Sequence, residues 1–67
     1  MHWNDVEEIA ESLEENYSDE DVEGLKLAEV EDLVRSLSDF EDHHREANRE
    51  ILKEILEAWI ELRRGAE

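Results

Sequence analysis

The side chains of this sequence that could do chemistry are carboxylates and one pair of histidines. His43 and His44 stand in the stretch SDFEDHHRE. Neutral imidazole is a common ligand of zinc, iron and nickel, and carboxylates bind hard cations. Adjacent residues on a helix point about 100° apart, so the two histidines are poorly placed to share one ion. Asp39, Asp42 and His43 could converge if this segment curls; alternatively, Asp42 caps the following helix and the histidines are exposed.

A second acidic group has the D-x-D spacing, with Asp19 and Asp21. The stretch lacks the glycine and the distal glutamate of an EF-hand, so no dedicated calcium loop is expected. Clustered carboxylates can still bind Fe²⁺, Mg²⁺ or Ca²⁺ weakly, and the alternative is a solvated acidic face. The candidate ligands of a weak metal site are Asp19, Asp21, Asp39, Asp42 and His43.

No set of residues indicates an enzyme. The chain has no cysteine, which excludes a thiolate metal site and a cysteine nucleophile. Its serines have no evident His-plus-acid partners, and a pair of catalytic carboxylates needs a cleft that three short helices hardly form. We therefore predict a protein without catalytic activity.

Negative charge dominates the composition. The chain has 22 acidic and 7 basic residues, a net charge of −15. Residues 1–44 carry 16 of the acidic residues and only two of the basic ones. This charge has the wrong sign for binding nucleic acid or an anionic membrane surface. Basic protein surfaces and metal cations are the partners that remain.

Three helices must position these acidic groups. The first is expected after Asn4 as its N-cap, with Glu7 completing a capping box. Its apolar residues recur with the 3.6-residue period of a helix at Val6, Ile9, Ala10, Leu13 and Tyr17. A single turn capped by Ser18 is expected over 19–23, with Gly24 as a stop because glycine accepts positive φ.

The second and third helices show the same periodicity. Val30, Leu33, Val34 and Leu37 form the stripe of the second. The third is expected to start between Asp42 and Ala47 and to end near Arg64, and its broad stripe predicts a central position: Ile51, Leu52, Ile55, Leu56, Trp59, Ile60 and Leu62. Phe40, alone among acidic residues, is predicted to enter the core.

The length of 67 residues predicts one small all-α domain, with three main helices and a short helical turn. No apolar run approaches the ~20 residues that span a bilayer, so a soluble, monomeric, cytoplasmic protein is the default expectation.

Four stretches resemble the IscX family of iron–sulfur cluster assembly proteins, in register from Trp3 to about Glu61. They are HWNDVEEIAESL, YSDED, LSDFED and ANREILKEILEAWIE. YSDED is similar to the family's Tyr-Pro-Asp-x-Asp-Pro, and LSDFED to its Leu-x-x-Phe-x-Asp-Asp-Pro. Matching positions include Trp3, Asp5, Tyr17, Phe40 and Trp59.

The resemblance implies a modified winged-helix domain that acts as an acidic adaptor. Such a protein binds the basic surface of a cysteine desulfurase, in competition with frataxin and ferredoxin, and binds ferrous iron weakly. The residues expected on the interaction face are Glu11, Glu14, Glu15, Asp19, Asp21, Asp39, Glu41 and Asp42.

The chain also departs from the family pattern. Ser18, Val22 and His44 occupy family proline positions, and His43 replaces a loop aspartate. The core positions are kept while several exposed ones are not. This pattern fits a diverged member, and it also fits a redesigned sequence that keeps the fold without the partner.

Overall fold

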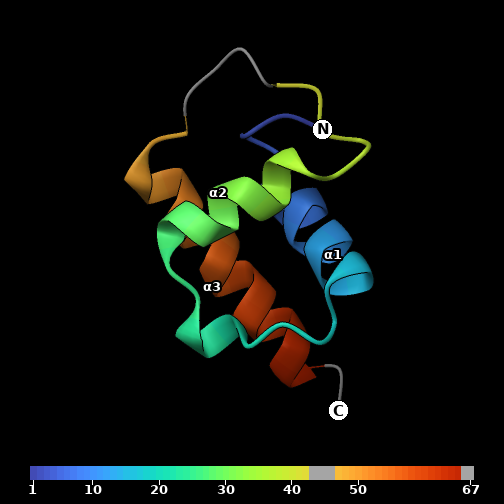
Figure 1. Ribbon diagram of the computed structural model, residues 1–67, viewed down its shortest axis with the longest axis vertical. Helices are drawn as coiled ribbons and strands as arrows, with labels where there is room; N and C mark the ends of the chain where they lie inside the picture. The colour runs from blue at the N-terminus through green and yellow to red at the C-terminus, as the bar shows by residue number, and fades with distance from the viewer. Residues whose placement is uncertain (43–46, 66–67) are drawn as a thin grey trace.

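The computed structural model describes residues 1–42 and 47–65 and shows an all-helical fold (Figure 1). Its elements are α1 (Val6–Asn16), the 3₁₀ turn η1 (Val22–Gly24), α2 (Leu27–Arg35) and α3 (Arg49–Gly65). The predicted three helices and short turn are therefore confirmed. The described ranges contain no β-strand, so the winged-helix part of the expectation is not confirmed.

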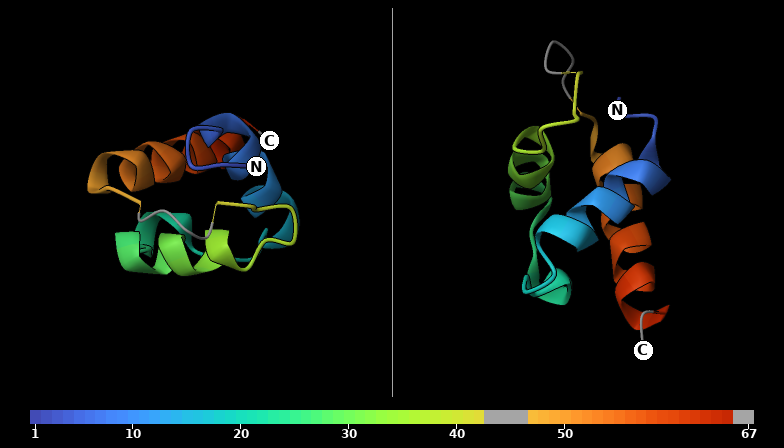
Figure 2. Two further views of the ribbon diagram at one scale, coloured as in Figure 1. Left: turned by 90° about the horizontal axis from the view of Figure 1, so that it is seen from above. Right: turned by 90° about the vertical axis from the view of Figure 1, so that its right-hand side faces the viewer.

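Helix α3 is the centre of the fold, as its broad apolar stripe predicts. It contacts α1, α2 and η1, whereas α1 and α2 touch each other much less. Figure 2 shows α2 on one side of the molecule and α3 on the other, with α1 packed across α3. The molecule measures 35 × 21 × 16 Å along its principal axes. Within the described ranges, no helix is long and apolar enough to cross a membrane.

The core is a single cluster of twelve buried hydrophobic residues drawn from every element. They are Trp3, Ile9, Ala10, Leu13, Val22, Val30, Val34, Leu37, Phe40, Leu52, Ile55 and Trp59. Burying each large aliphatic or aromatic side chain stabilises the fold by about 1.5–3 kcal/mol. The helical stripes that the sequence shows are thus the surfaces that hold the helices together.

The start of α1 differs from the prediction. The N-cap is Asp5 rather than Asn4, and no side chain caps the helix, so the predicted capping box is wrong. The Asp5 side chain instead accepts a hydrogen bond of 3.0 Å from the backbone N–H of His2, while the Asp5 N–H donates to the His2 carbonyl. The Asp5 carboxylate therefore stabilises a turn of the residues before α1 instead of capping the helix.

Helix α3 begins at Arg49, later in the chain than the start predicted between Asp42 and Ala47. The side-chain oxygen of Asn48 accepts a 2.7 Å hydrogen bond from the N–H of Ile51, the geometry of an N-cap. Asp42 therefore does not cap this helix. His43 and His44 lie outside the described residues. The two alternatives predicted for them, a metal site or exposed residues of the first helical turn, are therefore not tested.

The predicted single turn over 19–23 is present but displaced toward the C-terminus, at Val22–Gly24. Asp21, rather than Ser18, is its N-cap residue, and Gly24 does not adopt a positive φ. Val22 is buried, so the turn is placed by the packing of this side chain on α3 rather than by a glycine stop.

The segment that follows α2 is fixed to the core and to the start of the chain. Phe40 is buried, as predicted, and its ring meets that of Trp3 edge-on, with centroids 4.7 Å apart. The Arg35 guanidinium lies 5.5 Å from the Trp3 ring centroid. The Glu41 N–H donates to the Met1 carbonyl at 2.8 Å, so segment 36–42 runs beside the residues that lead into α1.

Candidate functional site

A groove of about 780 Å³ lies between α1 and α3, and we call it the α1–α3 groove. Its lining residues are Glu7, Ala10, Glu11, Glu14, Glu15, Ala58, Glu61, Leu62 and Gly65. Ala58 and Leu62 are half-buried and form an apolar floor, beneath which Ala10 is completely buried. Five glutamates rise around that floor, and the lining contains no basic residue.

Helical periodicity explains this arrangement. Glu7, Glu11 and Glu15 recur every four residues, so they follow one another along one side of α1. Their neighbour Ala10 faces α3, where its small side chain is completely buried. Like charges spaced i, i+4 weaken a helix by a few tenths of a kcal/mol per pair. Packing of α1 on α3 offsets this cost.

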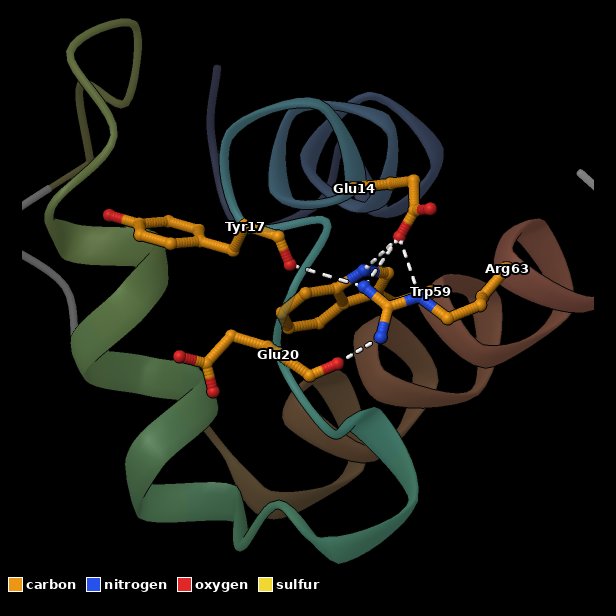
Figure 3. A network of polar contacts seen from close by, with 5 residues as sticks. All are labelled: Glu14, Tyr17, Glu20, Trp59 and Arg63. Carbon is orange, nitrogen blue, oxygen red and sulfur yellow. Dashed lines mark hydrogen bonds and ion pairs between the residues drawn. The ribbon is translucent and has the colours of Figure 1, made fainter.

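One glutamate of the groove, Glu14, belongs to a network that joins α1 to the end of α3 (Figure 3). Its oxygen Oε1 accepts a 2.9 Å hydrogen bond from the indole N–H of Trp59. The same oxygen accepts hydrogen bonds from Nε and Nη2 of Arg63, at 3.1 and 2.9 Å. The Arg63 guanidinium also lies 5.8 Å from the Trp59 ring centroid.

Arg63 extends this network to the connection between α1 and η1. Its Nη2 donates to the carbonyl of Tyr17 at 3.1 Å, and its Nη1 donates to the carbonyl of Glu20 (Figure 3). One guanidinium thus satisfies two main-chain carbonyls and one carboxylate from a segment more than forty residues away in the chain. A basic residue near the end of a helix suits the negative end of the helix dipole, but no local pattern in the sequence indicates these long-range contacts.

The network fixes the charge of Glu14. The hydrogen bond from Arg63, with help from Trp59 and the positive charge of Arg63, lowers the pKa of Glu14 below its ordinary value, although desolvation opposes this shift. Glu14 is thus an anion at neutral pH, but Arg63 compensates its charge. The other four glutamates of the groove are exposed and form no ion pair with a base in the described ranges.

The residues predicted for the interaction face fall into three groups. Glu11, Glu14 and Glu15 line the α1–α3 groove. Asp19 and Asp21 are exposed in the connection that leaves α1, and Asp39 and Glu41 are exposed in segment 36–42. Asp42, in the same segment, is half-buried. Sequence reasoning missed Glu7 and Glu61 as members of the groove, although the i, i+4 spacing of Glu7 and Glu11 is a signal that could have found Glu7.

The predicted metal ligands do not form one site. The connection that carries Asp19 and Asp21 and the segment that carries Asp39 and Asp42 lie toward opposite ends of the long axis (Figures 1 and 2). Within residues 1–42 and 47–65, no three side chains of the metal-binding types gather as ligands of one ion. His43 lies outside the described residues, and weak iron binding stays a prediction.

Comparison with known proteins gives the family. No solved structure matches this chain. The family model described as iron-sulphur cluster assembly matches residues 1–64, nearly the whole sequence. The resemblance in the aromatic and acidic motifs is therefore confirmed, and the chain belongs to the IscX family of iron–sulfur cluster assembly proteins.

Proposed function

We propose that this protein is a non-enzymatic adaptor of iron–sulfur cluster assembly that binds the positively charged surface of a cysteine desulfurase. Membership of the family supports a role in the assembly machinery. The observation that carries the finer proposal is the row of exposed, uncompensated glutamates along α1: Glu7, Glu11 and Glu15. In this role the protein competes for the enzyme surface with frataxin and ferredoxin.

Many of the acidic groups lie toward one side of the molecule, although α2 and α3 also carry exposed acidic residues, among them Glu29 and Glu50. Helix α1 contains five glutamates and no basic residue. Helix α1 is on the right in Figure 1, and segment 36–42 lies near its beginning. The connection 17–21 leaves its end and runs leftward to η1. The right-hand panel of Figure 2 looks onto this side, with α1 across the middle. These groups together offer a negative surface along the length of α1.

Three basic residues in the described ranges have no acidic partner there, and all three are on other segments. Lys26 precedes α2, and Arg49 and Lys53 are in the first turns of α3; none pairs with an acidic residue that the structure describes. The beginnings of α2 and α3 lie on the left in Figure 1, away from α1. A positively charged partner is therefore attracted more strongly to the α1 side than to the side that carries these three basic residues.

Surface charge of this kind acts mainly on the rate of association. Complementary charges raise association rate constants from about 10⁵–10⁶ M⁻¹s⁻¹ toward 10⁸–10⁹ M⁻¹s⁻¹ at low salt. The gain falls when salt screens the field, because the Debye length is about 8 Å at physiological ionic strength. We therefore expect desulfurase binding that weakens steeply as NaCl is added.

Charge reversal on α1 tests the proposal. The double variant Glu11→Lys/Glu15→Lys is expected to weaken binding to a purified cysteine desulfurase at least tenfold in low salt, measured by calorimetry. The matched control is Glu50→Lys/Glu54→Lys, which changes the same charge at the same i, i+4 spacing on exposed positions of α3 outside the groove. We expect this control to weaken binding only slightly.

Two outcomes would contradict the proposal. If the unmodified chain does not bind the desulfurase in low salt, it is not an adaptor of this enzyme. If both double variants lose the same affinity, only the net charge matters and α1 is not the contact surface.

Weak binding of ferrous iron is the second part of the proposal, and the exposed D-x-D pair Asp19 and Asp21 supports it. An anaerobic Fe²⁺ titration followed by NMR tests it. Asp19→Asn/Asp21→Asn is expected to remove the broadening of resonances near residues 17–21, whereas Asp39→Asn/Asp42→Asn removes that of segment 36–42. Broadening that neither variant changes would exclude both groups as ligands.

A further inference from the structure

The α1–α3 groove has an apolar floor, which electrostatic attraction to a basic partner does not explain. Ala58 and Leu62 form this floor, and most of the accessible lining of the groove is apolar. No large hydrophobic side chain is fully exposed in the described part of the chain, and Leu62 is half-buried. The groove is therefore a place where a partner can remove apolar surface from water, and not only a set of negative charges.

A second hollow has a different character. It holds about 210 Å³ between η1 and α3, and two of its lining residues, Arg63 and Arg64, are basic. Asp21 and Glu23 offset them, so this hollow does not select the charge of an occupant. The α1–α3 groove is larger and has glutamates as its only charged lining residues.

Glu7, Glu11 and Glu15 form the rim of the groove on the α1 side, and their spacing indicates which kind of partner can pair with them. Successive carboxylates at Glu7, Glu11 and Glu15 are about 6 Å apart along α1, from four residues at 1.5 Å each. Lysine or arginine side chains recur at nearly this distance on a helix at i, i+4 and on an extended segment at i, i+2. Their methylene stems can lie on the apolar floor while their charged ends reach the rim.

We infer that the α1–α3 groove receives one aliphatic side chain of a basic protein segment, held between lysines or arginines that pair with the rim glutamates. That the segment belongs to a cysteine desulfurase rests on the proposed function. The chemistry of the occupant rests only on the groove. Charge complementarity selects a basic segment, and the apolar floor selects an aliphatic residue at its centre.

The two contributions respond differently to salt. Ion pairs between exposed side chains are weak and are screened by salt. Burial of apolar surface does not depend on the Debye length, and placing a leucine rather than an alanine on the floor is worth about tenfold in affinity. Added NaCl is expected to weaken all binding while leaving the preference for leucine unchanged.

A pair of peptides tests the occupant directly. Each is a capped heptapeptide with arginines at positions 2 and 6, which share one face of an extended segment with the central residue. The central residue is leucine in one peptide and alanine in the other, and the remaining residues are alanines. Titration into the ¹⁵N-labelled protein at 20 and 150 mM NaCl is expected to show about tenfold tighter binding of the leucine peptide at both salts. Shifts should concentrate in residues 7–15 and 58–65. Equal affinities of the two peptides, or shifts elsewhere, would overturn the inference.

Filling the groove provides the matched variants. Ala58→Phe covers the floor without changing charge, and Ala28→Phe makes the same substitution at an exposed alanine of α2 outside the groove. We expect Ala58→Phe to abolish the preference for the leucine peptide and Ala28→Phe to keep it. Thermal melts check that both variants fold, and Ala58→Met replaces Ala58→Phe if the latter does not. A folded Ala58 variant that keeps the tenfold preference would contradict the inference.

Repeating the comparison with the desulfurase separates this inference from the proposed function. Weaker binding of Ala58→Phe than of Ala28→Phe supports both. Desulfurase binding that depends on Glu11 and Glu15 but not on Ala58 supports the adaptor and rejects the groove as its contact. A leucine preference without any desulfurase binding supports the groove and rejects the adaptor.

Discussion

At the scale of single residues, Glu14 differs from the other acidic residues of α1. Its oxygen Oε1 accepts three hydrogen bonds from Trp59 and Arg63, and about a quarter of its side chain is exposed. From the sequence, Glu14 is expected with Glu11 and Glu15 on the interaction face. No local pattern indicates the network, because the two residues that donate to Glu14 are 45 and 49 positions away in the chain. Two further hydrogen bonds of Arg63 go to main-chain carbonyls, which carry no sequence signal.

Replacement of Glu14 is expected to destabilise the fold. Glu14→Gln removes the charge from hydrogen bonds that a guanidinium donates, which costs about 1.5 kcal/mol at pH 7. The matched control Glu15→Gln removes an exposed charge with no ion-pair partner among the described residues, and is expected to leave stability unchanged or slightly higher. Chemical denaturation of both variants measures the difference. Equal stabilities at pH 7 would contradict the assigned role of the network.

The pKa of Glu14 sets how this difference depends on pH. Because folding lowers the pKa of Glu14, its charged form stabilises the native state above the unfolded-state pKa. This stabilisation is lost as the pH falls through the lowered native pKa. The gap in stability between the unmodified chain and Glu14→Gln should therefore be full at pH 7 and close in acid.

At the scale of the helices, the sequence predicted which faces are buried but not where helices begin. The stripes on α1, α2 and α3 are periodic over several turns, so their core faces follow directly from the 3.6-residue repeat. The ends depend on single hydrogen bonds. Asp5 turns toward His2 instead of capping α1, and Asn48 rather than Asp42 starts α3. Both alternatives were chemically reasonable, and tertiary structure selected between them.

The two asparagines test this reading of the helix starts. Asn48→Ala is expected to lower stability by about 1 kcal/mol, because the N–H of Ile51 loses its partner. Asn4→Ala, at the position that the sequence favoured as a cap, is expected to change stability by less than about 0.5 kcal/mol. For a domain of this size, 1 kcal/mol corresponds to about 4–8 °C in melting temperature. A larger effect of Asn4→Ala than of Asn48→Ala would contradict the structure.

The groove is also a property of the elements, and the sequence could predict only half of it. The i, i+4 glutamates of α1 are visible as one wall. The other wall, with Ala58, Glu61 and Leu62, depends on how α3 crosses α1, which no local pattern specifies. Two alanines at contact positions, Ala10 and Ala58, are the signal that small side chains line this crossing.

At the scale of the whole molecule, the net charge of −15 opposes folding. Ion pairs in the described ranges offset it locally, among them Arg35–Glu31, Arg63–Glu14, Arg64–Glu23 and the N-terminal amine with Glu41. Most acidic side chains of the described ranges are exposed. Their repulsion acts over several ångströms and is reduced by dissolved ions.

Thermal stability is therefore expected to rise with salt. The melting temperature should increase between 10 and 300 mM NaCl, and further at equal ionic strength when Mg²⁺ replaces Na⁺. Circular dichroism measures both. A melting temperature independent of salt would show that the charges are too dispersed to act together. Values of ~45–65 °C are typical of natural mesophile domains, and a much higher value would favour a redesigned sequence.

The position of Trp59 makes the protein its own optical probe. Its indole N–H donates a hydrogen bond to Glu14, which forms part of the groove wall, while the other tryptophan meets Phe40 of segment 36–42 edge-on. An occupant that disturbs Glu14 changes the emission of Trp59 and leaves that of Trp3 constant. With Trp3→Phe as the reporter background, arrival of a ligand at this wall can be timed by stopped-flow fluorescence without attaching a dye.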